Sequence, residues 1–291
     1  MPGATALSNR AGNAAPRMKA ADPILVVEDI VKRFDTPDGE LTAIDGVSFD
    51  VAPGEFLAVI GPSGCGKSTL FNVIGGLIDG YQGRVTVGGE IVRGPHAAIG
   101  MVFQEESTFP WRTVIENVAF PLEIAGIAKA ERLERARHFV ALVGLAGFER
   151  RYPAELSGGM RQRVSMARTL ASEPKILLMD EPFAALDEQT RLLLGDKVLQ
   201  IQQELKQTTL LITHNITEAV QLSDRILVMT YRPGRLKRVV PIDLPRPRTS
   251  EIVSSDAFGH YVAQIWSDLR EEATRGMEDA EAHSLRERPT P

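Results

Sequence analysis

Short runs of apolar residues recur along the chain and alternate with longer segments in which apolar and polar residues mix. The clearest runs are nearly continuous, as strands buried on both faces of a parallel sheet are. They occupy residues 56–60, 175–179, 210–213 and 225–229. Segments of helical pattern follow them, so the alternation predicts an α/β domain in which helices cover a mostly parallel sheet.

The mixed segments predict several helices. Residues 122–143 place apolar side chains such as Leu133 and Val140 at the spacing of one helix face. Ser157 is a good N-cap residue just before another helical pattern. Further helices are expected at residues 161–171, 190–205 and 216–222. A helical segment of about residues 106–157 is therefore inserted within the α/β core.

The part of the chain before the first buried strand has a different pattern. Residues 24–34 and 41–50 are rich in β-branched side chains and predict two strands. Farther along the chain, after the first buried strand and the helical segment that follows it, residues 83–92 predict a hairpin whose turn is a pair of glycines. Residues 1–22 are rich in Ala, Pro, Asn and Gly without any period, so we expect a disordered extension there.

The C-terminal part is expected to be an appendage. Residues 239–244 predict a short strand, and a helix follows with Trp266 at the edge of its apolar face. That face consists of Phe258, Tyr261, Val262, Ile265 and Leu269. The helix either packs on the body of the chain, which we favour, or contacts a partner. Residues 277–291 are expected to form a disordered tail.

Composition narrows the class of protein. The chain has 291 residues, with 43% hydrophobic and 24% charged residues, as in an ordinary globular protein. A net charge of −5 argues against broad electrostatic binding to nucleic acid. No apolar run approaches the roughly 18 residues that span a bilayer, and the start of the chain lacks the apolar core of a signal peptide. We therefore expect a cytoplasmic protein. The single cysteine, Cys65, excludes an internal disulfide and a cysteine metal cluster.

Residues 61–68 match the P-loop pattern G-x-x-x-x-G-K-[ST] between the apolar run at 56–60 and a helical segment from 69 to 74. Strand, glycine loop and helix start are the geometry that surrounds phosphates with backbone N–H groups. Lys67 is expected to reach the β- and γ-phosphates, and Ser68 to hold Mg²⁺. The alternative is a glycine-rich turn that binds nothing. A dinucleotide-binding loop is disfavoured, because G-x-G-x-x-G does not occur.

Two carboxylates and a histidine follow buried strands. Asp180 ends the run at 175–179 and is placed to hold Mg²⁺, and Glu181 is placed to orient or deprotonate the attacking water. His214 ends the next run and is placed to contact the γ-phosphate or the water. Each has a plainer interpretation as a turn residue or a structural histidine, which their combination with the P-loop disfavours.

In this order along the chain, the motifs resemble the nucleotide-binding subunit of an ABC transporter. The resemblance covers about residues 24–235 and adds Gln104, the run at 156–159 and Asp187 to the residues above. It implies an ABC-type P-loop NTPase fold with an antiparallel N-terminal β subdomain. It also implies an ATPase domain at residues 23–235, with residues 236–276 as a strand and helix extension.

The resemblance also implies roles for single residues. Gln104 matches the glutamine that senses Mg²⁺ and the attacking water. The catalytic residues are then Lys67, Gln104, Glu181 and His214. The magnesium residues are Ser68, Gln104 and Asp180. Phe34 matches the aromatic that stacks on adenine, although position alone favours a core residue. ATP is then bound by Phe34, Gly61, Pro62, Ser63, Gly64, Cys65, Gly66, Lys67, Ser68 and Thr69.

A second group of residues implies a dimer. Ser157, Gly158 and Gly159 match the signature motif, which caps the γ-phosphate held by another copy of the chain. Asp187 matches the loop that crosses to that copy. Two copies bind head to tail in the presence of ATP and separate after hydrolysis. Met160 and Asn215 depart from the family pattern without removing a catalytic group.

The subgroup is also argued by resemblance. Residues 110–118, 218–225, 232–235 and 265–270 look like those of the nitrate, sulfonate and taurine importers. This implies integral membrane permease subunits, with a short permease helix received by the surface from Glu105 to Trp111. It also implies, indirectly, a periplasmic or extracellular solute-binding protein. The expected location is the cytoplasmic face of the inner membrane. Trp111 is as readily a local core residue.

Two other classes remain. One is a soluble ABC-type ATPase that acts on nucleic acid or ribosomes, but such proteins usually carry two cassettes or a long coiled-coil insertion, and neither is present. The other is a nucleotide binder without activity, which the intact Lys67, Glu181 and His214 argue against. The expected cofactors are ATP and Mg²⁺, with no nucleic-acid partner.

Overall fold

A computed structural model of the chain describes residues 22–37, 39–104, 107–184 and 186–286. The expected extension at residues 1–22 lies almost wholly outside the described residues, as do residues 287–291 of the expected tail. Two sheets and seven α-helices make up the described part of the chain. None of these helices combines the length and the apolar character needed to cross a membrane.

The larger sheet has six strands in the order β10-β9-β3-β8-β7-β6. The strands are β3 (Phe56–Ile60), β6 (Ile99–Val102), β7 (Ile176–Asp180), β8 (Thr208–Ile212), β9 (Arg225–Met229) and β10 (Leu236–Pro241). All neighbours are parallel except β10, which pairs antiparallel with β9 at the edge. This confirms the mostly parallel sheet that the buried apolar runs predicted.

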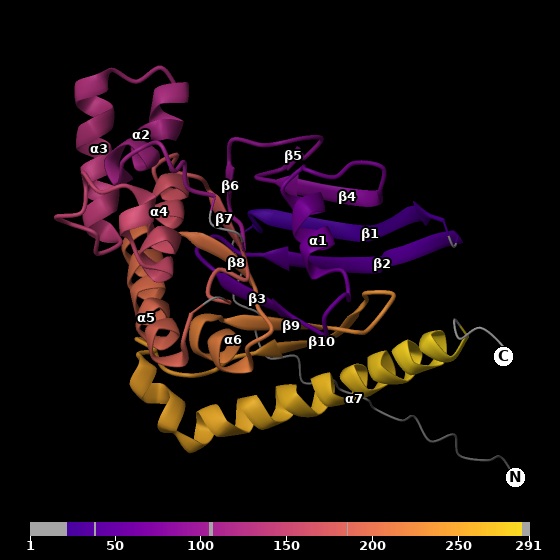
Figure 1. Ribbon diagram of the computed structural model, residues 1–291. Helices are drawn as coiled ribbons and strands as arrows, with labels where there is room; N and C mark the ends of the chain where they lie inside the picture. Colours follow the sequence, from indigo (N-terminus) through magenta and orange to yellow (C-terminus); the bar gives the residue numbers. More distant parts are fainter. Residues whose placement is uncertain (1–21, 38, 105–106, 185, 287–291) are drawn as a thin grey trace, which may run out of the picture.

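The smaller sheet is antiparallel, with the strand order β2-β1-β4-β5. Its strands are β1 (Leu25–Thr36), β2 (Gly39–Val51), β4 (Gln82–Val87) and β5 (Glu90–Ile91). The turn between β4 and β5 is the expected pair Gly88 and Gly89, both with positive φ. Helix α1 (Lys67–Ile74) lies between the two sheets, and its apolar side chains join both in one core (Figure 1).

The inserted segment is helical but not continuous. The helix expected over residues 122–143 is two helices, α2 (Val114–Ile124) and α3 (Lys129–Leu142). Gly126 adopts a positive φ of 76° just after α2, a conformation that ends helices and that glycine adopts readily. Both helices pack on α4 (Gly158–Leu170) at the end of the molecule away from the smaller sheet (Figure 1).

Two more helices cover the larger sheet. They are α5 (Glu188–Leu205) and α6 (Ile216–Leu222). The core on the α5 side is shared with α2, α3 and α4, and Phe183 is fully buried in it. These helices follow β7 and β8 in the chain, which places the residues after each strand at the same edge of the sheet.

The C-terminal part packs on the same face of the larger sheet as α5 and α6, at the end formed by β9 and β10. Phe258 and Ile265 of α7 (Asp256–Arg286) are buried against β9, β10 and α6, while Trp266 is exposed. Strand β10 begins at Leu236, three residues before the start expected at Val239. The first half of β10 lies at the sheet edge, so its residues are charged and partly exposed. The start of this strand therefore lacks the apolar run that marks the buried strands.

The expected disordered tail was wrong for its first ten residues. Helix α7 continues through residues 277–286 to Arg286. That stretch contains neither Gly nor Pro, and seven of its ten residues are Met, Glu, Ala, Leu or Arg, which are strong helix formers. A helix that is already formed extends at little cost into such a sequence, even without an apolar face.

Candidate functional site

The P-loop joins the end of β3 to the start of α1 and lies against the smaller sheet. Gly64 and Gly66 have φ values of 75° and 95°, in the left-handed region that favours glycine. A Cβ atom on Gly66 would lie 2.7 Å from the backbone oxygen of Ala43 in β2. Gly66 is also the N-cap of α1, and no side chain in the described structure caps that end. The helix N-terminus is thus free to meet an anion.

A cavity of about 270 Å³ opens at this loop. It is slightly smaller than the roughly 300–1,000 Å³ of typical ligand sites. Its lining consists of Phe34, Leu41, Ala43, Gly64, Gly66, Lys67, Ser68, Thr69 and Arg232. Phe34 is half-buried, lines this cavity and belongs to none of the hydrophobic cores described above.

Lys67 is the buried cation of the site, with 7% of its surface exposed. Its Nζ donates hydrogen bonds of 2.9 Å each to the backbone oxygens of Gly61 and Pro62. The thiol of Cys65 lies fully buried beneath it, at 3.8 Å from Nζ. Burial raises the pKa of this thiol, an effect that the charge of Lys67 partly offsets. Cys65 therefore stays a neutral packing residue under the loop.

Asp180 is the last residue of β7 and lies beside Ser68. Burial raises the pKa of its carboxyl, and a hydrogen bond with Ser68 acts in the opposite direction. Its Oδ1 atom is buried without a hydrogen-bond partner in the described structure. An orphaned carboxylate oxygen beside a hydroxyl fits Mg²⁺, which takes hard oxygen ligands from one or two side chains and completes its shell with phosphates and water.

Glu181 and His214 come together from the ends of neighbouring strands. Glu181 has a φ of 45° and donates its backbone N–H to Ile212 of β8. This conformation turns its carboxylate toward His214, whose Nδ1 lies 3.1 Å from Oε2. The carboxylate is mostly shielded, whereas the His214 ring is more than half exposed. The pair therefore joins a shielded base to a histidine that faces outward.

Gln104 lies at the same edge of the sheet. It follows β6, whose last residue Val102 pairs with Met179 immediately before Asp180. Gln104 is exposed. The strand-end residues that the sequence singled out are thus at one edge of the parallel sheet, as the topology requires. Residues 105–106, at the start of the expected permease surface, lie outside the described residues.

The signature residues form a separate group. Ser157 caps α4 and accepts a hydrogen bond from the Met160 N–H, at 3.3 Å. Asp187 caps α5 in the same way, with its Oδ1 accepting from the Thr190 N–H at 3.0 Å. Ser157, Gly159 and Thr190 line one cavity of about 420 Å³, which shares no lining residue with the cavity at the P-loop. Gly158 and Gly159 form the first turn of α4.

Sequence reasoning missed Arg232 as part of the site. It follows β9, lines the cavity, and donates from Nε to the Gly64 backbone oxygen at 2.9 Å. A signal was present, because β9 is a buried strand parallel to β3 and residues after such strands gather at one edge. The arginine was noted only as part of a resemblance between short stretches.

A larger cavity of about 660 Å³ lies elsewhere, between α3, the end of α4 and the end of α5. Its lining includes the acidic Glu131, Glu134 and Glu173 and lacks a glycine loop. Volume alone therefore does not locate the candidate site, and the smaller cavity is the one with phosphate-binding features.

Comparison with known proteins agrees with this geometry. Residues 44–184 match the ABC transporter family model. An uncharacterised ABC transporter ATP-binding protein of Methanocaldococcus jannaschii is 49% identical over 87% of this chain and 94% of its own length. The nitrate import ATP-binding protein NrtD of Synechocystis sp. is 42% identical over 87% of this chain and 98% of its own. The aliphatic sulfonates import ATP-binding protein SsuB of Bacillus licheniformis is 40% identical over 88% of this chain and 95% of its own length.

Among solved structures, the dimeric ATP-binding cassette MJ0796 in a post-hydrolysis state with ADP and phosphate is similar. It has a TM-score of 0.68 and 29% identity, over 76% of this chain and all of that chain. Fold, P-loop and relatives agree on an enzyme that hydrolyses ATP with Mg²⁺. The chain belongs to the ABC transporter family, as one of its ATP-binding subunits.

Proposed function

We propose that this chain is the energy-coupling subunit of an ABC importer for a small anionic or polar solute. The relatives named for nitrate and aliphatic sulfonate import support this class of solute. A pair of such chains acts at the cytoplasmic face of the cell membrane, bound to permease subunits that receive the solute from a binding protein. The observation that carries the proposal is the convergence of the P-loop, Asp180, Glu181 and His214 in a chain so similar to import subunits.

The residues of the loop bind the triphosphate. Lys67 carries the buried positive charge, and the N-terminus of α1 offers its uncapped N–H groups. Phe34 offers a ring face for the adenine, and Lys32 packs on that ring with its Nζ 4.8 Å from the centroid. A half-buried aromatic beside the loop suits stacking, because any purine presents a flat face.

The hydrolysis step falls to Glu181. Its carboxylate accepts a proton from the attacking water or orients it. His214 contacts the carboxylate through Nδ1, and the exposed part of its ring remains available for the γ-phosphate. Asp180, Ser68 and Gln104 would hold the magnesium ion. When bound, Mg²⁺ would neutralise part of the negative charge of the phosphates.

The second cavity acts on the nucleotide of another copy. Ser157 and the first turn of α4 present a hydroxyl and backbone N–H groups, which suit a γ-phosphate. Asp187 lies beside this group and reaches the partner copy across the same interface. The dimeric state of the similar cassette supports this arrangement. ATP then joins two copies, and hydrolysis lets them part.

The contact with the permease lies near Trp111. Its side chain is 71% exposed, so the alternative of a local core residue is disfavoured. The segment behind it is held by Asn117, which is fully buried. The Asn117 Oδ1 accepts from the Phe109 N–H at 2.7 Å, and its Nδ2 donates to the carbonyls of Phe109, Arg112 and Thr113. A large exposed aromatic on a fixed segment suits a protein interface.

The test is a co-purification from membranes of the native cells. Full-length Glu181→Gln protein with ATP and Mg²⁺ is expected to retain an integral membrane partner together with two copies of the chain. Two controls accompany it, a Glu181→Gln/Lys67→Ala variant that loses the nucleotide and a Glu181→Gln/Trp111→Ala variant that loses the permease. An ATP-dependent dimer that captures nucleic acid, or no membrane protein, would contradict the transport assignment and leave the ATPase assignment in place.

A further inference from the structure

The turn of residues 230–235, between β9 and β10, touches the P-loop on one side. Arg232 donates from Nε to the Gly64 oxygen at 2.9 Å, and Gly234 donates its N–H to the Ala43 oxygen at 3.0 Å. Within the turn, the Thr230 hydroxyl donates to the Pro233 oxygen and accepts from the Arg235 N–H. The turn therefore has a fixed shape that holds Arg232 against the nucleotide loop.

The guanidinium of Arg232 has donors left for a ligand. Nε is used on Gly64, and the described structure gives Nη1 and Nη2 no partner. Nη2 lies 2.8 Å from the point where a Cβ on Gly64 would be, and Arg232 lines the cavity with Lys67. Its side chain is exposed. The cavity thus contains a second cation, with a planar donor pair suited to phosphate oxygens.

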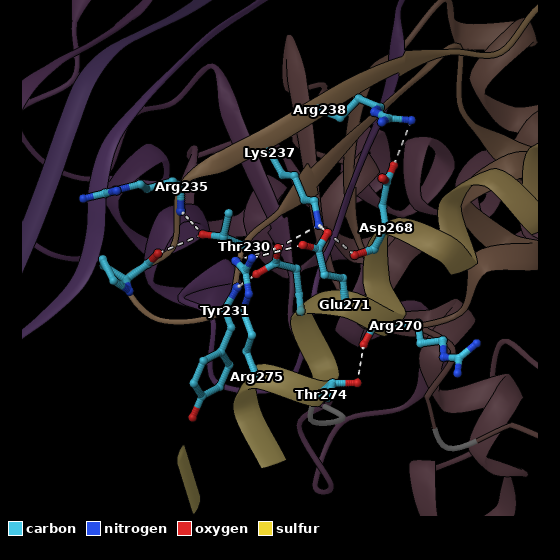
Figure 2. Close-up of polar contacts among 12 residues, drawn as sticks. Thr230, Tyr231, Arg235, Lys237, Arg238, Asp268, Arg270, Glu271, Thr274 and Arg275 are labelled. Carbon is cyan, nitrogen blue, oxygen red and sulfur yellow. Dashed lines mark hydrogen bonds and ion pairs between the residues drawn. The ribbon is translucent and has the colours of Figure 1, made fainter. Parts of the chain in front are cut away.

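On its other side, the turn is held by the C-terminal helix. Glu272 of α7 is 2% exposed and accepts the Tyr231 N–H at 3.0 Å, next to Arg232. It also accepts from the Lys237 Nζ at 2.7 Å, and Lys237 bonds to Glu271 as well. A Cβ on Gly276 would lie 2.9 Å from the Tyr231 ring, so helix and ring are in close contact. Figure 2 shows Tyr231 and Lys237 beside this stretch of α7.

Glu272 is a carboxylate that a folded protein buries only with partners. Burial by itself would raise the pKa of Glu272, but the bonds from Lys237 and from the Tyr231 N–H bring it below its ordinary value. The group is therefore a charged, fully bonded link between α7 and the turn. Its neighbour Glu271 bonds to the same lysine and to Arg275 but does not contact the turn.

We propose that Arg232 is a further nucleotide-binding residue, which contacts the phosphates of the bound nucleotide, and that Glu272 of α7 positions it through Tyr231. This inference rests on the proposed function of the cavity as the ATP site. It gives the C-terminal helix a part in nucleotide affinity, although α7 contributes no residue to the lining of the cavity. The competing view is that Arg232 serves only to hold the P-loop through Gly64.

The experiment measures binding of Mg·ADP to the full-length chain by titration calorimetry at several salt concentrations. Arg232→Ala is expected to weaken binding about tenfold, a typical effect of one charge-assisted hydrogen bond, and to reduce the loss of affinity on adding salt. Arg232→Lys is expected to restore part of the affinity and of the salt dependence, because the charge returns without the planar fork. A purely structural arginine would leave the salt dependence unchanged.

The positioning role is tested with Glu272→Ala and its matched control Glu271→Ala. Glu272→Ala is expected to weaken Mg·ADP binding about threefold, and Glu271→Ala to leave it unchanged. The double variant Arg232→Ala/Glu272→Ala is expected to match Arg232→Ala alone, because residues acting in one chain of contacts are not additive. Glu272→Gln, which keeps an acceptor for the Tyr231 N–H, is expected to bind Mg·ADP as the wild-type chain does, and a loss as large as that of Glu272→Ala would refute positioning through Tyr231.

The outcomes separate the two proposals. Loss of binding in Lys67→Ala together with wild-type binding in Arg232→Ala would refute the role of Arg232 and keep the ATP site. Additive effects in the double variant, or an equal loss in Glu271→Ala, would refute positioning by Glu272. Absence of Mg·ADP binding in the wild-type chain would refute the proposed function itself.

Discussion

Two helix N-termini contribute to the candidate sites of this chain, and they differ in how they are capped. At α1, the N-cap is Gly66 in a left-handed conformation, without a capping side chain, facing a cavity lined by Lys67 and Arg232. At α4, the N-cap is Ser157, whose hydroxyl accepts a hydrogen bond from Met160 in its own first turn. Both ends attract anions. One is left open by its own chain, and the other is already capped.

The surroundings differ in the same sense. The cavity at α1 brings cations, an aromatic ring and, beside it, the carboxylates of the β7 edge. The hollow at α4 is lined by Arg163, Lys197 and the exposed Leu193, and neither carboxylate of the catalytic edge lines it. The difference teaches that the P-loop region gathers its cations, ring and carboxylates within one chain, whereas the α4 region presents a capped helix end and two cations.

The first prediction tests whether ATP hydrolysis takes place at the α1 region. Glu181→Gln is expected to lower the rate of ATP hydrolysis about 10²–10⁴-fold, the usual contribution of a positioned base. Nucleotide affinity is expected to persist, since Glu181 lies at the reacting end. Steady-state turnover and ADP titration measure the two effects. Glu204→Gln, an exposed change on α5, is the control, and equal losses in both variants would contradict the assignment.

A pair of lysines sharpens the contrast in binding. Lys67→Ala is expected to weaken ATP binding by between about tenfold and about a hundredfold, the range for a lost hydrogen bond to a charged group. Lys197→Ala, at the α4 hollow, is expected to leave ATP binding to the single chain unchanged. Fluorescent nucleotide titration of dilute protein measures both. A large loss in Lys197→Ala would mean that the two regions are not separate.

Two glycines test which region is shaped by its own chain. Gly66→Ala is expected to lower the free energy of unfolding by about 2 kcal/mol or more, because a left-handed alanine is strained and its Cβ would lie 2.7 Å from the Ala43 oxygen. Gly159→Ala is expected to change it by less than about 1 kcal/mol, because its Cβ would make ordinary contacts at 3.4 Å and 3.5 Å. Urea unfolding measures both.

The turnover of Gly159→Ala completes this test. A methyl group that its own chain tolerates would obstruct the approach of a second copy, so ATP-dependent dimers in gel filtration and turnover are expected to decline together. Normal dimers and turnover would show that this glycine meets nothing outside the chain.

The smallest effect concerns the cap itself. Ser157→Ala is expected to destabilise the chain by about 1 kcal/mol, the usual loss for a removed N-cap. ADP affinity of the single chain is expected to remain unchanged, since Ser157 lies outside the first cavity. Thermal unfolding with and without ADP measures this. A smaller ADP-induced stabilisation in the variant would contradict the separation of the two regions.

Much of this arrangement could be predicted from the sequence because it follows from strand ends. Apolar runs identified β3, β7, β8 and β9, and in a parallel sheet the residues after each strand gather at one edge. Asp180, Glu181 and His214 were therefore expected close together, and Glu181 and His214 do lie in contact. The P-loop pattern likewise specified the start of α1.

Other features depend on contacts that no local pattern records. Arg232 enters the cavity because the turn of residues 230–235 is bonded to Ala43 and Gly64, which are distant in sequence. Phe34 alternates like any strand residue, and only the neighbouring loop makes it part of a cavity. The break between α2 and α3 follows from the positive φ of Gly126. The helical spacing of apolar residues continues across this glycine, so it does not reveal the break.

The buried Asn117 has a consequence for the rate and the affinity with which a partner could bind near Trp111. Both ends of its amide bond to the backbone around Trp111, so this surface takes its shape when the chain folds. A segment that is already ordered loses little conformational entropy on docking. In the proposed contact with the permease, the indole of Trp111 would be presented by a segment that is already ordered. Little of the binding free energy would then be lost to ordering the segment around Trp111.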